Sequence, residues 1–303
     1  MLSAMSEITY EFDTVIGVDI GGTTIEAAAV SPTGTFLHDP VAAESPSNGT
    51  YEEVVSHLAD VVLAACERTP NGIVGASSFG MPGPFKYAEG VSDMDHKFAA
   101  IKGLPLGQLI TERTGLPTYW MNDADAFGVG AAGWFANLKP GARRVIGITI
   151  GTGLGGSFVE DGEVVASDDH RTPMDGEIWN LPRGGNILEH WVSGPGLARI
   201  YESMTGESLD AKTVSVMARS GDKAAIAAYE QMGVILGEAL APLSARFEAD
   251  AIVVGGNVAK SFKLFASAMV GEMVRRNQEP HVIPAPTDNL AIRGAARYAF
   301  TNL

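Results

Sequence analysis

The sequence is poor in cysteine, with Cys66 alone among 303 residues. A single thiol excludes an intrachain disulfide and a zinc site built on several cysteines. Cys66 lies in the run YEEVVSHLADVVLAACERT, whose apolar residues recur with a helical period, so we expect the thiol to pack in the core. The lack of disulfides favours a reducing compartment, and we expect a cytoplasmic protein.

Basic residues and long apolar runs are also scarce. Lys and Arg number 21 against 36 Asp and Glu, which gives a formal net charge of −15. Nucleic acids and anionic membranes attract basic surfaces, so this balance argues against both as partners. No apolar run reaches the ~18 residues that a membrane-spanning helix needs, and the N-terminus lacks a signal-peptide pattern. Small molecules remain as partners, including anions whose charge backbone amides can neutralise locally.

Hydrophobic residues make up 46% of the sequence and charged residues 19%, so the chain can bury a full core. Its length suits two domains of ordinary size. In each half, apolar runs typical of strands come first and helical patterns follow. We therefore expect two α/β domains that face each other across a cleft.

The most informative segment is VIGVDIGGTTIEAAAV, in which an apolar strand runs into Asp19, Gly21-Gly22, Thr23 and Thr24. Glycines without a Cβ let phosphate oxygens approach the backbone N–H groups, and the threonines add hydroxyl donors. The carboxylate can hold hydrated Mg²⁺ or orient a reacting hydroxyl. Taken alone, the segment also fits an ordinary hairpin with a Gly-Gly turn.

Two further strands end in glycine turns. VIGITIGTGLGGSFVE contains Gly151-Thr152-Gly153, and AIVVGGNV contains Gly255-Gly256 followed by Asn257. Three such turns after β-branched runs are harder to explain as ordinary loops than one. None is followed by Lys-Ser or Lys-Thr, which excludes a Walker A loop. The similarity of the first two turns suggests an internal duplication at domain scale.

Asn122-Asp123 lies where a predicted strand passes into a predicted helix, the edge at which ligands meet α/β sheets. The amide of Asn122 can donate to and accept from a polyol hydroxyl, and Asp123 can take a proton from a hydroxyl nucleophile. The alternative is that either side chain merely caps the helix. We expect Asp125 to be solvated or structural.

The segment DGEIWNLPRGGNILEHWVSGPGL, rich in turn residues, supplies Glu177, Asn180 and Glu189. Carboxylates together with an amide are the groups that bind neighbouring sugar hydroxyls, although acidic loop residues are usually only solvated. The segment also contains Trp179 and Trp191. We expect both to pack in the core rather than to line a sugar site.

These motifs, in this order, resemble the ROK family of sugar kinases, within the superfamily of actin-like, hexokinase-type ATPases. VDIGGTTIEAAAV and GITIGTGLGGSFVEDGEV are similar to the family's two phosphate motifs. MPGPFKYAEG resembles its Pro-Gly-Pro turn, and MNDADAFGVGAAGW its Asn-Asp-Ala motif. VVGGNV resembles the glycines beside the adenosine, and DNLAIRGAA the C-terminal segment. The resemblance runs from about Val15 to Arg297.

The resemblance implies two actin-like (ribonuclease H-like) α/β domains that flank a cleft. The first would span residues 1–122 and the second 123–288, with a C-terminal helix at about 289–303 packing back on the first. It also implies an ATP- and Mg²⁺-dependent carbohydrate kinase that forms a homodimer. The acceptor would be a hydroxyl, most simply the 6-hydroxyl, of a hexose or related sugar.

The resemblance further implies roles for matching positions. Asp123 would be the catalytic base with Asn122 beside it on the sugar, and Glu177 and Glu189 match the family's two sugar-binding carboxylates. Asp19 would hold Mg²⁺ through water. The residues expected to bind phosphate or border the nucleotide are Asp19, Gly21, Gly22, Thr23, Thr24, Gly151, Thr152, Gly153, Gly255, Gly256 and Asn257.

The chain departs from the family pattern at two places. Three residues after the first carboxylate the family usually has His, and this chain has Asn180, which can still hydrogen-bond a sugar hydroxyl. Most members then carry a cysteine-rich zinc segment, whereas this chain has the shorter NLPRGGNI, so no structural zinc is expected. The sugar pocket is therefore not the usual one, and glucose is not assigned as the substrate.

Three alternatives to an ATP-dependent kinase follow from the same family. Some zinc-free relatives use polyphosphate as donor, and NDADA resembles their motif, but the negative net charge argues against a polyphosphate channel. The presence of Asp19, Asp123 and both phosphate turns argues against a non-catalytic sugar sensor, whereas the altered sugar pocket leaves this alternative open. A sugar-responsive repressor would need an N-terminal DNA-binding domain, and a phosphate motif that begins at Val15 leaves no room for one.

Overall fold

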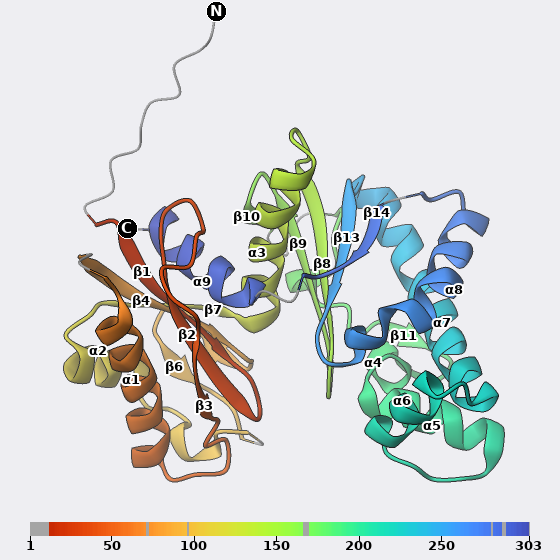
Figure 1. Cartoon of the computed structure of the whole chain (residues 1–303), viewed down its shortest axis with the longest axis horizontal. Helices are drawn as coiled ribbons and strands as arrows, with labels where there is room; N and C mark the ends of the chain where they lie inside the picture. The colour runs from red at the N-terminus through yellow and green to blue at the C-terminus, as the bar shows by residue number, and fades with distance from the viewer. Residues whose placement is uncertain are drawn as a thin grey trace, which may run out of the picture. The chain divides into compact units, whose positions relative to one another are not determined.

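The computed structural model describes residues 12–70, 73–95, 97–165, 170–279, 281–286 and 289–302 (Figure 1). The chain divides into two compact units. Unit 1 consists of Met1–Ala126 together with Ala291–Leu303, and unit 2 consists of Phe127–Leu290. The mixed α/β fold is the class expected from the sequence.

Unit 1 is built on a five-stranded sheet in the order β3-β2-β1-β4-β7. Strand β2 pairs antiparallel with both β1 and β3, whereas β4 pairs parallel with both β1 and β7. Their bounds are β1 (Thr14–Ile20), β2 (Thr24–Val30), β3 (Val41–Glu44), β4 (Val74–Met81) and β7 (Thr118–Asn122). Two short strands, β5 (Phe85–Lys86) and β6 (Val91–Ser92), pair separately, and a 3-10 turn, η1 (Ala99–Ile101), follows them.

Helices cover both faces of this sheet (Figure 1). Successive residues of β1 point to opposite faces, so Ile16 and Val18 pack with one pair of helices and Val15 with another helix. The pair is α1 (Tyr51–Arg68) and α2 (Leu106–Thr114), and the helix on the other face is α9 (Leu290–Thr301). A Cβ at Gly17 would come within 2.1 Å of the Ile292 carbonyl oxygen. Glycine at position 17 is therefore what lets α9 approach the sheet.

The predicted start of α1 is confirmed. Thr50 Oγ1 accepts from the Glu53 backbone N–H at 3.3 Å, and Glu53 Oε2 accepts from the Thr50 backbone N–H at 2.7 Å. This reciprocal pair is the capping box that the sequence indicates. The predicted passage from strand to helix at Asn122-Asp123 is also confirmed, because β7 ends at Asn122 and α3 (Asp123–Leu138) begins at Asp123.

Unit 2 repeats the strand order of unit 1. Its sheet runs β10-β9-β8-β13-β14, with an antiparallel pair at β8 and β9 and parallel pairs from β8 through β13 to β14. The strands are β8 (Arg144–Ile150), β9 (Leu154–Glu160), β10 (Glu163–Val164), β13 (Ala251–Gly255) and β14 (His281–Pro284). The repeated order agrees with the duplication that the two glycine hairpins suggest.

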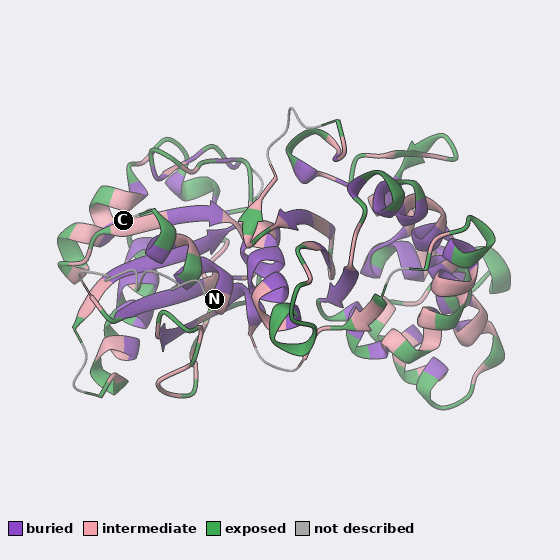
Figure 2. Ribbon diagram, turned by 90° about the horizontal axis from the view of Figure 1, so that it is seen from above, coloured by how far each residue is buried: buried purple, intermediate pink, exposed green. Residues whose placement is uncertain are grey.

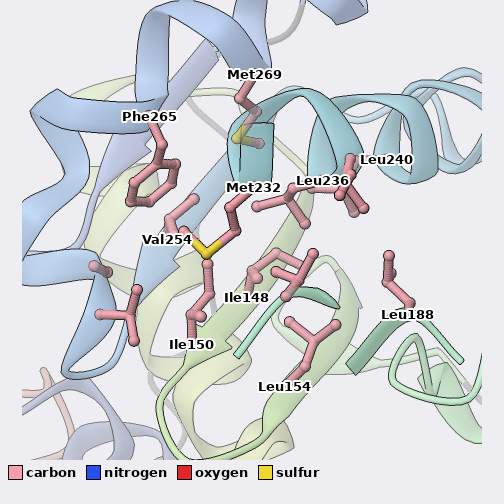
Figure 3. Close-up of a cluster of buried hydrophobic side chains, with 14 of the residues drawn as sticks. Ile148, Ile150, Leu154, Leu188, Met232, Leu236, Leu240, Val254, Phe265 and Met269 are labelled. Carbon is pink, nitrogen blue, oxygen red and sulfur yellow. The ribbon is translucent and has the colours of Figure 1, made fainter. Parts of the chain in front are cut away.

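The core of unit 2 joins this sheet to a layer of helices (Figure 3). Ile148 and Ile150 of β8 meet Met232 and Leu236 of α7, and Leu188 lies in the same cluster. The helices are α4 (Leu188–Trp191), α5 (Gly194–Thr205), α6 (Ala211–Arg219), α7 (Lys223–Phe247) and α8 (Phe262–Arg275). The shorter elements of unit 2 are η2 (Met174–Gly176), β11 (Pro182–Arg183), β12 (Asn186–Ile187) and η3 (Val258–Ser261).

Helix α3 packs on the opposite face of the unit 2 sheet through glycines. A Cβ at Gly147 of β8 would lie 2.7 Å from the Gly128 Cα, and a Cβ at Gly128 would lie 2.5 Å from the Ser157 side chain. The inner strands of both sheets are largely buried (Figure 2). In the described part of the chain, no helix is long and apolar enough to cross a membrane.

The sequence patterns do not predict two edge strands, and the expectation that Cys66 packs in the core holds only in part. β3 and β14 have four residues each and mostly exposed or half-buried side chains, so they lack the apolar runs of the central strands. Cys66 is half-buried and packs against the hydrophobic cluster of unit 1. Its thiol pKa is raised by burial first and then by Glu67.

Candidate active site

The first predicted phosphate turn joins β1 to β2 in unit 1. The Gly21 backbone N–H donates to the Thr24 carbonyl at 2.9 Å, and a Cβ at Gly21 would come within 2.9 Å of that same oxygen. A residue with a side chain is therefore excluded at position 21 by the turn itself. Gly22, Thr23 and Thr24 are exposed. Their carbonyl oxygens accept from the Ser47 hydroxyl, the Ser45 N–H and the Gly21 N–H, respectively.

Asp19 lies at the end of β1, opposite Glu26 of β2. Desolvation, followed by the negative charges of Asp123 and Glu26, raises the pKa of Asp19 to about 7. The negative charges of Asp123 and Glu26, which add to the effect of desolvation, are what a divalent cation would neutralise. Because Mg²⁺ takes oxygen ligands and keeps several waters, the Asp19 carboxylate fits a hydrated Mg²⁺.

Asp123 begins α3 at the carboxyl end of β7. Its pKa is raised mainly by desolvation, against the lowering effects of the Ala124 backbone N–H and of Lys97. The Ala124 N–H donates to Asp123 Oδ1 at 2.9 Å. A carboxylate with a raised pKa at a helix start is suited to act as a general base.

Asn122 caps α3, as the alternative interpretation of this residue predicts. Its Oδ1 accepts from the Ala124 N–H at 2.9 Å and from the Asp125 N–H at 3.3 Å. Its Nδ2 donates to the Tyr87 hydroxyl at 3.0 Å, and that hydroxyl donates to the Met81 carbonyl at 3.0 Å. One amide hydrogen of Asn122 is thus used, and the second is left for a ligand.

Tyr87 is a site residue that the sequence analysis did not identify. It lies 35 positions before Asn122 and reaches that residue only because β4 and β7 are neighbouring parallel strands. The only signal in the sequence is its position shortly after the Pro-Gly-Pro turn of MPGPFKYAEG.

The second predicted phosphate turn, Gly151-Thr152-Gly153, joins β8 to β9 in unit 2. Its ends are closed by a bond from the Gly151 N–H to the Gly153 carbonyl at 2.9 Å. The Gly194 N–H, at the first turn of α5, donates to the Gly151 carbonyl at 2.7 Å. Thr152 is exposed. The turn is therefore held by a hydrogen bond from α5 as well as by the bond within the turn.

Glu189 lies against this second turn. Its Oε2 accepts from the Leu154 backbone N–H at 2.9 Å, and a Cβ at Gly153 would come within 2.6 Å of the same oxygen. Gly153 thus makes room for Glu189. The sequence does not reveal this contact, which ties a predicted sugar carboxylate to a predicted phosphate turn.

Glu177 and Asn180 lie together in the loop that leads to the β11–β12 hairpin. The Asn180 Nδ2 donates to Glu177 Oε2 at 3.0 Å. The side-chain oxygen of Asn180 therefore points away from Glu177 and can accept a hydrogen bond from another group. The Glu189 N–H donates to the Trp179 carbonyl at 3.0 Å. Hydrogen bonds within the loop therefore connect the segment that carries Glu177 and Asn180 to the segment that carries Glu189.

The expectation for the two tryptophans holds for one of them. Trp191 packs against the core of unit 2. Trp179 is 37% exposed, and the expectation of core packing is wrong for it, because Ile178 takes the buried position beside it.

The third glycine turn follows β13, next to the second. A Cβ at Gly255 would come within 2.5 Å of the Phe127 ring, and Gly256 has a φ of 90° with its Cβ position 2.5 Å from the Ile150 carbonyl oxygen. Packing alone therefore requires both glycines. Asn257 is exposed at the start of η3 and makes no capping bond there.

The predicted residues thus divide between the units. Asp19, Asn122, Asp123 and the first turn lie in unit 1, whereas the second and third turns and the loop predicted to bind the sugar lie in unit 2. Among the residues that the structure describes, no three His, Cys, Asp or Glu side chains gather closely enough to hold a metal ion.

Comparison with known proteins places the chain in a family. The profile of the ROK family matches residues 15–301. The chain belongs to the ROK family. The predicted resemblance is therefore confirmed across nearly the whole length.

Its relatives include glucokinase of Thermotoga maritima, 27% identical over 82% of this chain and 83% of that protein. N-acetyl-D-glucosamine kinase of Photobacterium profundum is 26% identical over 92% of this chain and 97% of its own.

Solved structures of ROK proteins share the fold. A glucokinase from Streptomyces griseus, in complex with glucose and AMPPNP, aligns with a TM-score of 0.75 and 25% identity over 94% of this chain and 98% of its own. A hexokinase from Thermus thermophilus aligns with a TM-score of 0.76 and 24% identity over 95% and 98%. The expected fold class is confirmed by these alignments.

Proposed function

We propose that this chain is an ATP-dependent sugar kinase that transfers the γ-phosphoryl group to a hydroxyl of a hexose or related sugar. The observation that carries the proposal is Asp123, a poorly solvated carboxylate with a raised pKa at the start of α3. The relatives named glucokinase and N-acetyl-D-glucosamine kinase, and the neighbour with glucose and AMPPNP, support the substrate classes.

In this mechanism the Asp123 carboxylate takes the proton of the acceptor hydroxyl, most simply the 6-hydroxyl, as that oxygen attacks the γ-phosphorus. The bond from the γ-phosphorus to the bridging oxygen breaks, and ADP leaves with that oxygen. Asn122, Glu177, Asn180 and Glu189 orient the sugar. The threonine hydroxyls face the phosphates, together with the backbone N–H groups of the glycine turns other than those of Gly21 and Gly151, which bond within the turns. Phosphoryl transfer depends mainly on positioning and on charge neutralisation. Mg²⁺, held at Asp19 through water, would supply part of that neutralisation.

In the proposed site, the nucleotide is bordered by Gly255, Gly256 and Asn257. We further propose a homodimer in the cytoplasm, in keeping with the ROK resemblance and the single cysteine.

The test is an ADP-release assay with MgATP across neutral hexoses, N-acetylated hexosamines and free amino sugars. Asp123→Asn should lower kcat by about a hundredfold or more, in line with the loss of a general base. The matched control is Asp125→Asn, two residues further along α3, which should stay within a few-fold of wild type. Near-wild-type turnover of Asp123→Asn would overturn the assignment. Phosphorus-coupled NMR of the product identifies the hydroxyl that is phosphorylated.

A further inference from the structure

A short hairpin, formed by β11 and β12, separates Asn180 from Glu189. No side chain of residues 182–187 is buried, whereas Ile178 before the hairpin and Leu188 after it are completely buried. The hairpin therefore has no apolar anchor of its own, although it connects two of the proposed sugar contacts.

One side chain of the hairpin reaches the helices of unit 2. Arg183 forms an ion pair with Glu238 of α7. Glu238 also pairs with Arg276 at 3.2 Å, and the Arg276 Nε donates to Glu272 Oε1 at 2.8 Å. The Glu238 and Glu272 side chains are only 23% and 10% exposed, so this network is less screened than an ion pair on open surface.

The backbone of the hairpin is tied at the same residue. The Trp191 Nε1 donates to the Arg183 carbonyl at 3.2 Å, and Trp191 packs against the core. Arg183 is thus held through its carbonyl on one side and through its guanidinium on the other. Among the described residues of the hairpin, Arg183 alone forms an ion pair.

A displacement of the hairpin would also move the side chains that are proposed to bind the sugar. Asn180 lies three residues before Arg183 and donates to Glu177. The Glu189 N–H donates to the Trp179 carbonyl, so the segments that enter and leave the hairpin are bonded to each other.

We propose that Arg183 is a positioning residue, whose ion pair with Glu238 holds the loop 177–189 in the geometry that binds the sugar. This inference rests on the proposed function, because it takes Glu177, Asn180 and Glu189 as sugar contacts. Arg183 acts through these side chains and does not touch the reacting atoms.

The kinetic test compares Arg183→Met with Arg275→Met. The first keeps the apolar stem and removes the guanidinium. The second removes a guanidinium of α8 that bonds Glu272 and that, among the described residues, forms no ion pair with the hairpin. Arg183→Met should raise KM for the sugar about fivefold, with KM for ATP and kcat within about twofold. Arg275→Met should change none of the three. Melting temperatures establish that each variant is folded.

Two further measurements separate positioning from general stability. Glu238→Gln should raise the sugar KM as Arg183→Met does, and the double variant should be no worse than the larger single effect. Hydrogen exchange followed by mass spectrometry should show faster exchange at 177–189 in Arg183→Met and unchanged exchange there in Arg275→Met.

The outcomes distinguish this inference from the proposed function. An active wild-type enzyme whose sugar KM is unchanged by Arg183→Met, or whose KM values for sugar and ATP rise together, overturns the positioning role alone. Unchanged exchange at 177–189 also overturns it. A folded wild type that phosphorylates no sugar in the panel overturns the proposed function, and the positioning role falls with it.

Discussion

Asp19 is a single carboxylate whose surroundings oppose its charge. Its pKa of about 7, against an ordinary 3.8, means that the folded chain binds more protons than the unfolded chain between about pH 4 and 7. The free energy of unfolding should therefore fall as pH rises through this window and level off above it. Asp19→Asn removes the charge and should be more stable than wild type at pH 8, on the order of 2 kcal/mol, with no such gain at pH 4.

Urea unfolding of both proteins in Mg²⁺-free buffer across this pH range measures the difference. A gap between the two proteins that stays constant with pH would contradict the role of the Asp19 charge.

Tyr87 acts on Asn122 through one hydroxyl. Tyr87→Phe leaves the Asn122 amide and the Met81 carbonyl without this partner. One such hydrogen bond contributes about 1 kcal/mol, so we expect KM for the sugar to rise roughly fivefold with a smaller change in kcat. Tyr119→Phe, on the strand that ends at Asn122, is the control and should leave KM unchanged. Equal effects of the two substitutions on KM would argue against the Tyr87–Asn122 link.

At the scale of elements, α3 carries Asp123 and is positioned by its glycines. Gly128→Ala would drive a Cβ to 2.5 Å from Ser157, whereas nothing lies within 4 Å of a Cβ at Gly133 in the same helix. We expect Gly128→Ala to lower the free energy of unfolding by about 1–3 kcal/mol. Gly133→Ala should raise it by up to about 1 kcal/mol, because alanine favours the helix. Denaturant titration of both variants measures the change in the free energy of unfolding. A change of the same sign in both variants would contradict this packing.

The sequence patterns predict the elements that carry their own signals. The capping box of α1 and the glycine turns after β1, β8 and β13 are local, so they can be recognised without the fold. The edge strands β3 and β14 take their structure from a neighbouring strand. Contacts between distant positions, such as Tyr87 with Asn122 or Arg183 with Glu238, depend on strand order and helix packing and have no local signature.

At the scale of the whole molecule, each unit has the same plan. A glycine turn joins the central strand to its antiparallel neighbour in both sheets, and parallel strands follow on the other side. The carboxyl end of a central parallel strand is where α/β sheets bind ligands. Two copies of one glycine hairpin are therefore a consequence of the repeated sheet, and their spacing in the sequence follows from the size of one unit.

The net charge of −15 bears on the choice of phosphoryl donor. A long polyphosphate carries many more negative charges than ATP, so repulsion from the whole protein should slow its binding more. We expect kcat/KM for MgATP to exceed that for polyphosphate at least about tenfold at low ionic strength. Raising the salt from about 20 to 200 mM shortens the screening length, so the ratio should shrink. Polyphosphate preferred over ATP at low salt would reverse the assignment of the donor, because it would require a local basic channel strong enough to overcome the charge of the molecule.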